Sequence, residues 1–260
     1  MSNLKFLLAV WKANLLSAME YRVSFLMQML GMMLNNMMYF LIWVIFFDRF
    51  QDVGGWGVND MYVTFGITSS AFGLVSVLFG NTFTLGDIIT RGRLDYYLSL
   101  PKPVLLHALA SRSTASGLGD FLYGFLSFAA SGFITPDSFL RFVLAIGFAA
   151  SVFAAFMILV QSLAFWIGTT TSLVGVAVNA MLTFAIYPIT LFDTTARLIL
   201  FTLIPAALMG TVPASFVRTF TWEVLLQLFV GALVLLTLAV LTFQAGLRRY
   251  ESGSGIQVEI

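Results

Sequence analysis

The sequence predicts an all-α integral membrane protein, because charged residues are scarce, uncharged runs are long and basic residues are unevenly placed. Hydrophobic residues make up 60% of the 260 residues and charged residues 10%, whereas soluble domains carry about 25% charged residues. Such a chain cannot cover a soluble domain with charge, so a lipid bilayer is its expected surrounding. A net charge of +1 supplies no basic patch, and a nucleic-acid partner is therefore not expected.

Residues 1–22 precede the first apolar run and predict an amphipathic helix lying along the cytoplasmic leaflet. Lys5 and Lys12 are one heptad apart, which places them within about 20° of each other on a helix. Apolar side chains cover much of the remaining surface, as in interfacial helices. No small-residue cleavage site follows a short apolar core, so a signal peptide is not expected.

Six apolar runs predict transmembrane helices, since about 20 apolar residues cross about 30 Å of hydrocarbon. Five are uncharged, and the third carries Asp120 near its start. Together they form a transmembrane domain over residues 23–247. The uncharged stretch 142–192 is too long for one crossing, and the polar string of residues 168–172 divides it. The predicted spans are residues 23–47, 61–86, 117–135, 142–167, 173–192 and 224–243.

Residues 198–217 are also uncharged, but Pro205 and Pro213 each remove a backbone donor. We therefore expect outer re-entrant helices before the last span, not a seventh crossing. With six spans and both termini in the cytoplasm, nine Lys and Arg residues lie inside and four outside. Seven spans would give eight and five, which fits the positive-inside rule less well. The tail, residues 248–260, is then cytoplasmic.

The sequence contains few residue patterns that would indicate an enzyme. The chain has no Cys and one His, His107, which leaves no thiolate metal site or cysteine nucleophile. It also has no phosphate-binding GxxxxGK[ST] loop. Residues 117–120 match the GxGD string of intramembrane aspartyl proteases, but no second acid lies in a clear span to share a proton. Asp120 is interpreted as a residue near a helix start at the cytoplasmic edge, and no catalytic residue, metal or cofactor is expected in this chain.

A few polar side chains within the predicted spans are candidates for a substrate path. Buried amides also join helices, at about 0.6–2 kcal/mol each, so plain helix packing is the alternative. No row of acids is present to bind ions, which disfavours an ion-coupled transporter or a cation channel. The candidates are Asn35, Asn36, Asn179 and Tyr187.

The loop after the second predicted span alternates apolar and charged residues and ends at prolines that stop any helix. On the residues alone, it is a cytoplasmic anchor that follows the positive-inside rule. Its prominent residues are Arg91, Arg93, Leu94, Asp95, Tyr96, Tyr97, Leu98 and Pro101.

Two strings give the chain a resemblance to a known family. Residues 92–101, Gly-Arg-Leu-Asp-Tyr-Tyr-Leu-Ser-Leu-Pro, resemble the GxL[DE]xxLxxP string of permease subunits of ABC-2 type exporters, with Asp95 where relatives often carry Glu. Residues 246–253, Gly-Leu-Arg-Arg-Tyr-Glu-Ser-Gly, resemble the end of one bacterial subfamily of these permeases. The resemblance covers essentially the whole chain.

The resemblance implies a permease without its own ATPase, in a bacterial cytoplasmic (inner) membrane, that exports an amphiphilic or hydrophobic drug-like or lipid-like substrate. A dimer of ATP-binding cassette subunits would bind ATP and Mg and supply hydrolysis, and a second, identical or paralogous permease would complete the membrane part. The loop from Arg91 to Pro101 would be the coupling helix that docks into the ATPase. A scaffold or assembly protein that moves nothing is the alternative.

Overall fold

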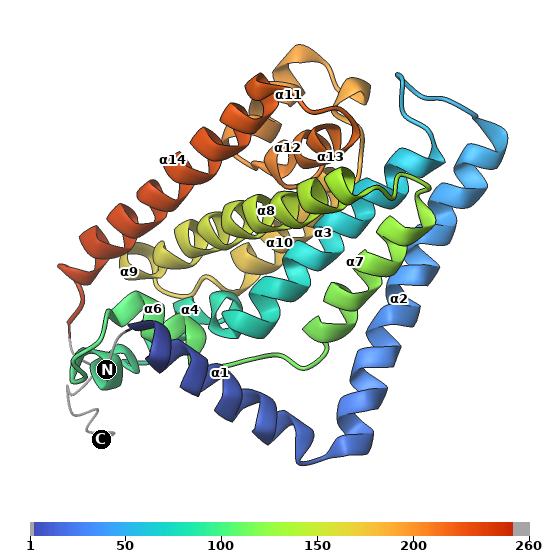
Figure 1. Ribbon diagram of the computed structural model, residues 1–260. Helices are drawn as coiled ribbons and strands as arrows, with labels where there is room; N and C mark the ends of the chain where they lie inside the picture. Colours follow the sequence, from blue (N-terminus) through green and yellow to red (C-terminus); the bar gives the residue numbers. More distant parts are fainter. Residues whose placement is uncertain (1–2, 252–260) are drawn as a thin grey trace.

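The computed structural model describes residues 3–251, which form helices and contain no β-strand within that range. The longer helices lie side by side, and α1 runs across one end of them (Figure 1). They are α1 (Asn3–Met19), α2 (Arg22–Arg49), α3 (Val58–Leu78), α7 (Gly117–Ala130), α8 (Pro136–Ser162), α10 (Thr171–Ala185) and α14 (Trp222–Leu247).

Four of these helices are long and apolar enough to cross a membrane: α2, α3, α14, and α8 with its continuation α9 (Ala164–Ile167). The helices α7 and α10 have 14 and 15 residues, or about 21 and 22 Å at 1.5 Å per residue. Both are shorter than the hydrocarbon core. The chain is thus a multi-pass helical membrane protein, and the count of six spans stays a prediction.

The second apolar run differs from its prediction, because α3 ends at Leu78 and not at residue 86. Polar groups after it bond to the segment that precedes α7: the Gly80 amide donates to the Arg112 carbonyl at 2.9 Å, and Asn81 Nδ2 to the Ala108 carbonyl at 2.8 Å. Residues 80–90 instead form η1 (Gly80–Phe83) and α4 (Leu85–Thr90). Hydropathy alone did not distinguish these short helices from a continuous span.

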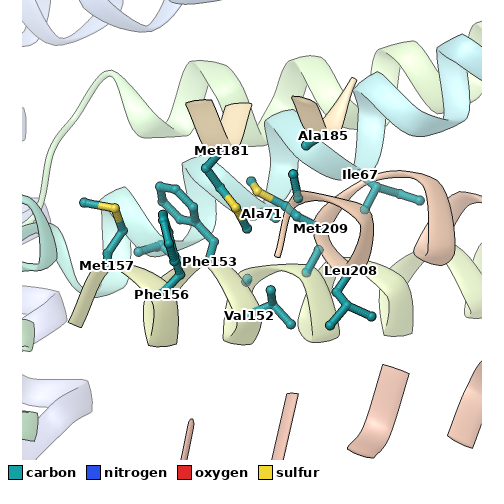
Figure 2. Close-up of a cluster of buried hydrophobic side chains, with 14 of the residues drawn as sticks. Ile67, Ala71, Val152, Phe153, Phe156, Met157, Met181, Ala185, Leu208 and Met209 are labelled. Atoms are coloured by element: carbon teal, nitrogen blue, oxygen red, sulfur yellow. The ribbon is translucent and has the colours of Figure 1, made fainter. Parts of the chain in front are cut away.

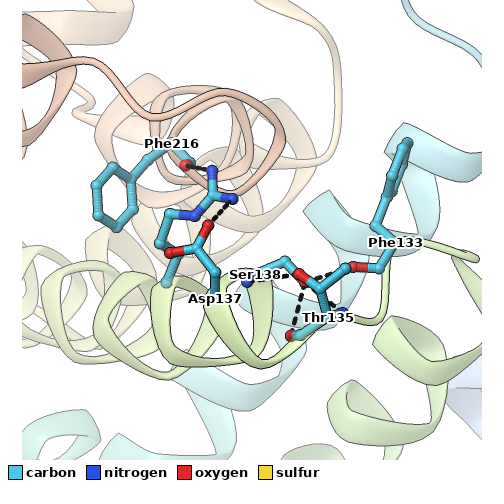
Figure 3. A network of polar contacts seen from close by, with 6 residues as sticks. Phe133, Thr135, Asp137, Ser138 and Phe216 are labelled. Carbon is cyan, nitrogen blue, oxygen red and sulfur yellow. Dashed lines mark hydrogen bonds and ion pairs between the residues drawn. The ribbon is translucent and has the colours of Figure 1, made fainter.

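The fourth run begins earlier than predicted, at Pro136 and not at residue 142. Thr135 caps the helix by accepting the Ser138 amide at 3.1 Å, and a proline at the first helical position loses no needed donor. Asp137 pairs with Arg141 one turn along the helix. The charges that suggested a loop therefore lie within the first turns of α8 (Figure 3).

Residues 194–218 form three short helices, α11 (Thr194–Thr202), α12 (Ala206–Met209) and α13 (Thr211–Arg218), with a 67° bend after α11. Pro205 lies at this bend. Pro213 is the third residue of α13, where the backbone nitrogen needs no intrahelical acceptor. The two prolines therefore differ: Pro205 accompanies the break and Pro213 does not interrupt its helix.

The apolar core lies where α3, α8, α10 and α12 meet (Figure 2). Its side chains are fully or almost fully buried, and α3 is the most enclosed long helix, whereas α2 and α14 expose most of their residues. The labelled members are Ile67 and Ala71 of α3, Val152, Phe153, Phe156 and Met157 of α8, Met181 and Ala185 of α10, and Leu208 and Met209 of α12.

Small residues let α7 approach α3 backbone to backbone. A Cβ added at Gly66 would lie 2.8 Å from the Gly124 carbonyl oxygen, and one added at Gly117 would lie 3.0 Å from the Gly73 carbonyl oxygen. Membrane helices associate closely through such residues. The same contact brings the first turns of α7, with Asp120, beside α3.

The two ends of the helix bundle are formed by different short helices and loops. The first is called the coupling end after the predicted coupling residues 91–101 that it contains. There lie α1, α4, α5 (Leu94–Leu98), α6 (Val104–Ala110), α9 and the end of α14 (Figure 1). At the second, the far end, lie residues 50–57 and α11 to α13.

Candidate functional site: a polar groove and a coupling region

A groove of about 270 Å³ lies between α2, α3, α7 and α10. It is mostly apolar, with a minority of amide, hydroxyl and carboxyl side chains. The lining residues are Met32, Asn35, Asn36, Tyr39, Phe65, Thr68, Ser69, Phe72, Asp120, Asn179, Leu182, Thr183 and Ile186.

A hydrogen bond across the groove joins α2 to α7. Asn36 Nδ2 donates to Asp120 Oδ1 at 2.6 Å, between residues 84 positions apart in the sequence. Helices α2 and α7 also approach closely at Gly119, the residue before Asp120. A Cβ added at Gly119 would lie only 3.0 Å from the Met32 side chain. On the α3 side, Ser69 Oγ donates to the Asp120 backbone carbonyl at 2.8 Å. Asp120 is thereby fixed between three helices.

Three of the four residues predicted for a substrate path line this groove: Asn35, Asn36 and Asn179. Tyr187 does not line it. Its ring lies edge-on to Trp43, with centroids 5.0 Å apart, and its backbone carbonyl accepts Thr211 Oγ1. The reason is that Tyr187 follows the end of α10, so it lies toward the far end, beyond the groove.

Asp120 lies near a helix start, as the sequence predicts, but its burial in the groove was not expected. It is 3% exposed and belongs to the first turn of α7, packed between α2 and α3. An acid within an otherwise apolar run is itself a signal of function in a membrane protein. The contact with α2 was not predictable, because the approach of α2 to α7 is not visible in the sequence.

The coupling end contains the predicted coupling residues, and the structure divides them into buried and exposed sets. Leu94 is fully buried. Tyr97 is half-buried, its hydroxyl lies 2.8 Å from Ser111 Oγ, and its ring meets His107 of α6 edge-on with centroids 5.1 Å apart. These two residues therefore attach α5 to the rest of the protein.

Of the remaining predicted coupling residues, all except Asp95 are exposed. Tyr96 is 63% exposed and Leu98 is 43% exposed. The others are exposed or, for Asp95, partly buried, and α5 itself is a single short helix of five residues. The exposed or partly buried polar and proline members are Arg91, Arg93, Asp95 and Pro101.

Helix α1 is bound to the same end by side-chain contacts. Trp11 Nε1 donates to the Leu78 carbonyl at 2.7 Å, and Asn14 Nδ2 donates to the Ala110 carbonyl at 3.2 Å. The Phe6 ring meets His107 edge-on at 4.8 Å. Burial, and then the nearby charge of Lys102, lower the pKa of His107.

The two strings that carry the family resemblance meet in space. Tyr250 follows α14, and its ring lies edge-on to Phe165 of α9 at 6.3 Å between centroids. Burial first, and then the Asp95 side chain, raise the pKa of Tyr250 to about 12. The phenol is therefore neutral, beside the start of α5. The rest of the tail string, from residue 252, lies outside the described residues.

The far end is held by two arginines. Arg218 pairs with Asp60 at 2.8 Å between Nε and Oδ1 and stacks on Trp56, 4.8 Å from the ring centroid. Arg141 donates to the Phe216 carbonyl at 3.2 Å, which ties α8 to α13 (Figure 3). These contacts hold α13 against the beginnings of α3 and α8.

Comparison with known protein families identifies the family of the chain. The family model described as ABC-2 family transporter protein matches residues 33–254. The chain belongs to this ABC-2 transporter family. It is accordingly the membrane permease of an ABC-type transporter, a class whose ATPase is a partner subunit. Neither a curated protein nor a solved structure matches the chain significantly.

The matched range includes the lining residues of the groove except Met32, and the coupling end except α1. In this ABC-2 permease, the polar groove lies among the long helices, and the exposed part of α5 lies at one end of them.

Proposed function

We propose that this permease exports an amphiphilic or hydrophobic substrate, drug-like or lipid-like, from the cytoplasm or inner leaflet of a bacterial cytoplasmic membrane. The groove between α2, α3, α7 and α10 is the substrate path, with Asn35, Asn36 and Asn179 among its polar contacts. A dimer of ATP-binding cassette subunits binds ATP and Mg, and two permeases, identical or paralogous, form the membrane part. Both termini lie in the cytoplasm.

The exposure pattern of α5 supports this proposal most directly. A permease without an ATPase site needs a small rigid element that the ATPase can hold. Tyr96 and Leu98 expose apolar surface, while Leu94 and Tyr97 fix the same helix to the protein. Exposed aromatic and aliphatic residues on a supported element are typical anchors of protein interfaces.

A physical connection from α5 to the groove is also present. Tyr97 contacts Ser111, which follows α6. Gln161 near the end of α8 accepts the Gly86 amide at 2.8 Å and donates to the Thr82 carbonyl at 3.2 Å. The short helices after α3 are thus clamped between α6 and α8, and α3 itself lines the groove with Thr68, Ser69 and Phe72. Displacement of α5 would therefore act on a groove wall.

The test is the double variant Tyr96→Ala and Leu98→Ala in the full chain, co-expressed with its ATPase. Truncation of central anchors commonly costs about 2 kcal/mol or more, so the variant should insert normally and lose most of the co-purifying ATPase. The matched control is Leu16→Ala and Tyr21→Ala, the same residue types, also exposed, outside α5. Normal ATPase binding by the Tyr96 and Leu98 variant would overturn the coupling assignment.

A further inference from the structure

The groove contains polar atoms that the protein leaves without partners. Asp120 Oδ2 and Thr68 Oγ1 are buried and have no hydrogen-bond partner among the described residues. Both residues line the groove, and they are 3% and 4% exposed. A buried polar group without a partner costs free energy. Two such groups at one groove indicate that something else supplies their partners.

The charged residues that line the groove indicate the charge of the ligand that would supply these partners. Asp120 is the only acidic residue among the lining residues, and no Lys or Arg is among them. Asn36 donates a hydrogen bond to Asp120 Oδ1 and thereby orients the carboxyl group. Asp120 Oδ2 receives no hydrogen bond from the described residues. A buried carboxylate is costly without a countercharge. A positively charged ligand supplies that countercharge, whereas an anionic ligand would repel it.

The rest of the lining indicates the shape of the ligand. Phe65, Phe72 and Tyr39 contribute aromatic rings, which attract cations as well as apolar groups. The volume of about 270 Å³ is near the lower limit of small-molecule pockets, about 300–1,000 Å³. Tyr39 is 60% exposed, so the groove reaches the protein surface there. A compact head fits inside, and an apolar remainder can extend along α2.

We propose that this groove binds the ammonium head of an amphipathic organic cation, with Asp120 as its countercharge and Thr68 as a second acceptor. The inference rests on the proposed function, because it assigns a substrate class to the groove that serves there as the path. An N–H of the head would donate to Asp120 Oδ2 and another to Thr68 Oγ1, while the aromatic rings cover its apolar part.

The first test compares ligands on the wild-type permease–ATPase complex in nanodiscs without nucleotide. The probes share one skeleton: 4-phenylbutylammonium is cationic, 4-phenylbutanol is neutral and 4-phenylbutyrate is anionic. Dissociation constants by equilibrium dialysis should rank the cation tightest and the anion weakest. Equal binding of the alcohol and the ammonium, or tighter binding of the anion, would overturn the proposal without any variant.

The second test removes the charge. Asp120→Asn keeps the shape and should weaken ammonium binding about ten-fold or more, with little change for the alcohol. Asp120→Glu should restore part of the preference. Asp48→Asn, an exposed acid on α2, is the matched control and should change nothing. An unchanged ammonium affinity in Asp120→Asn would show that Asp120 only joins α2 to α7.

Thr68→Val serves as the further variant if Asp120→Asn does not fold, since it removes only a hydroxyl. It should reduce ammonium binding several-fold, and unchanged binding would remove Thr68 from the site. Failure of the ammonium proposal is distinguishable from failure of the proposed function. A complex that retains its ATPase through Tyr96 and Leu98 but shows no preference for cations remains a permease with a different substrate class.

Discussion

At the scale of single residues, a few buried polar side chains hold the helices of the coupling end together. His107 is the clearest case: it lies at 7% exposure between Phe6 of α1 and Tyr97 of α5. The nearby Lys102 ammonium also lies over the Phe6 ring, 5.3 Å from its centroid. His107 therefore joins its own helix, α6, to the neighbouring α5 and to the distant α1 while it is uncharged.

This arrangement predicts an acid-sensitive coupling end. The folded-state pKa of His107 is lowered from an unfolded value near 6.5. At this group the unfolded state therefore binds more protons in mildly acidic solution, so the contribution of His107 to stability is complete above about pH 6.5 and falls as the pH drops below it. The thermal midpoint of the purified protein should decrease between pH 7 and pH 5.5.

The control for this prediction is His107→Gln, which cannot titrate. The chain has no other histidine, so the thermal midpoint of the wild type should fall further over this interval than that of the variant. An equal slope in both proteins would assign the pH dependence to other groups.

At the scale of elements, the contact between α3 and α7 is set by glycines. A Cβ at Gly124 would meet the Ser70 side chain and the Gly66 carbonyl oxygen at distances that no packing tolerates. Ser127 Oγ also donates to the Tyr62 carbonyl at 2.8 Å, which fixes the register of the two helices. The groove depends on this register, because Ser69 of α3 bonds to Asp120 of α7 and Thr68 of α3 lines the same groove.

Gly124→Ala should therefore destabilise the protein although alanine favours helices. Overpacking of a tight contact costs about 1–3 kcal/mol, so the thermal midpoint in detergent should fall clearly. Gly147→Ala, in α8 with nothing within 4 Å of its added Cβ, is the matched control and should be neutral or slightly stabilising. Equal midpoints for the two variants would contradict close packing of α3 against α7.

At the scale of the whole molecule, the basic residues separate between the two ends. Arg49, Arg141, Arg197 and Arg218 lie on helices or helix ends at the far end, and the remaining nine basic residues belong to segments gathered at the coupling end (Figure 1). This separation agrees with the positive-inside rule if the coupling end faces the cytoplasm. The 67° bend at residues 203–205 leaves α11 to α13 at the far end.

Single cysteines can test this topology, because the chain has none of its own. Asn59→Cys should react with a membrane-impermeant thiol reagent in intact cells. Ser99→Cys and Glu251→Cys should react only after the membrane is permeabilised, which also serves as their positive control. All three positions are exposed. Labelling of Glu251→Cys from outside would indicate seven spans, with residues 194–218 crossing the membrane.

Much of the helical architecture was predictable from the sequence, because burial in lipid imposes long apolar runs that end at charges, caps and prolines. The family followed from two short strings, residues 92–101 and 246–253, and the family match confirms it. The boundaries at Leu78 and Pro136 were not predictable from charge alone, since one depends on hydrogen bonds to residues 108–112 and the other on a helix cap followed by an ion pair.

The tertiary structure alone decided which side chains meet. Sequence spacing could not show that Asn36 bonds to Asp120 across 84 positions, nor that Leu94 and Tyr97 turn inward while Tyr96 and Leu98 turn outward. A sequence determines the period of a helix, but the helix rotation about its own axis follows from packing against distant neighbours. For this permease, that rotation places an acid in the groove and leaves Tyr96 and Leu98 of α5 exposed.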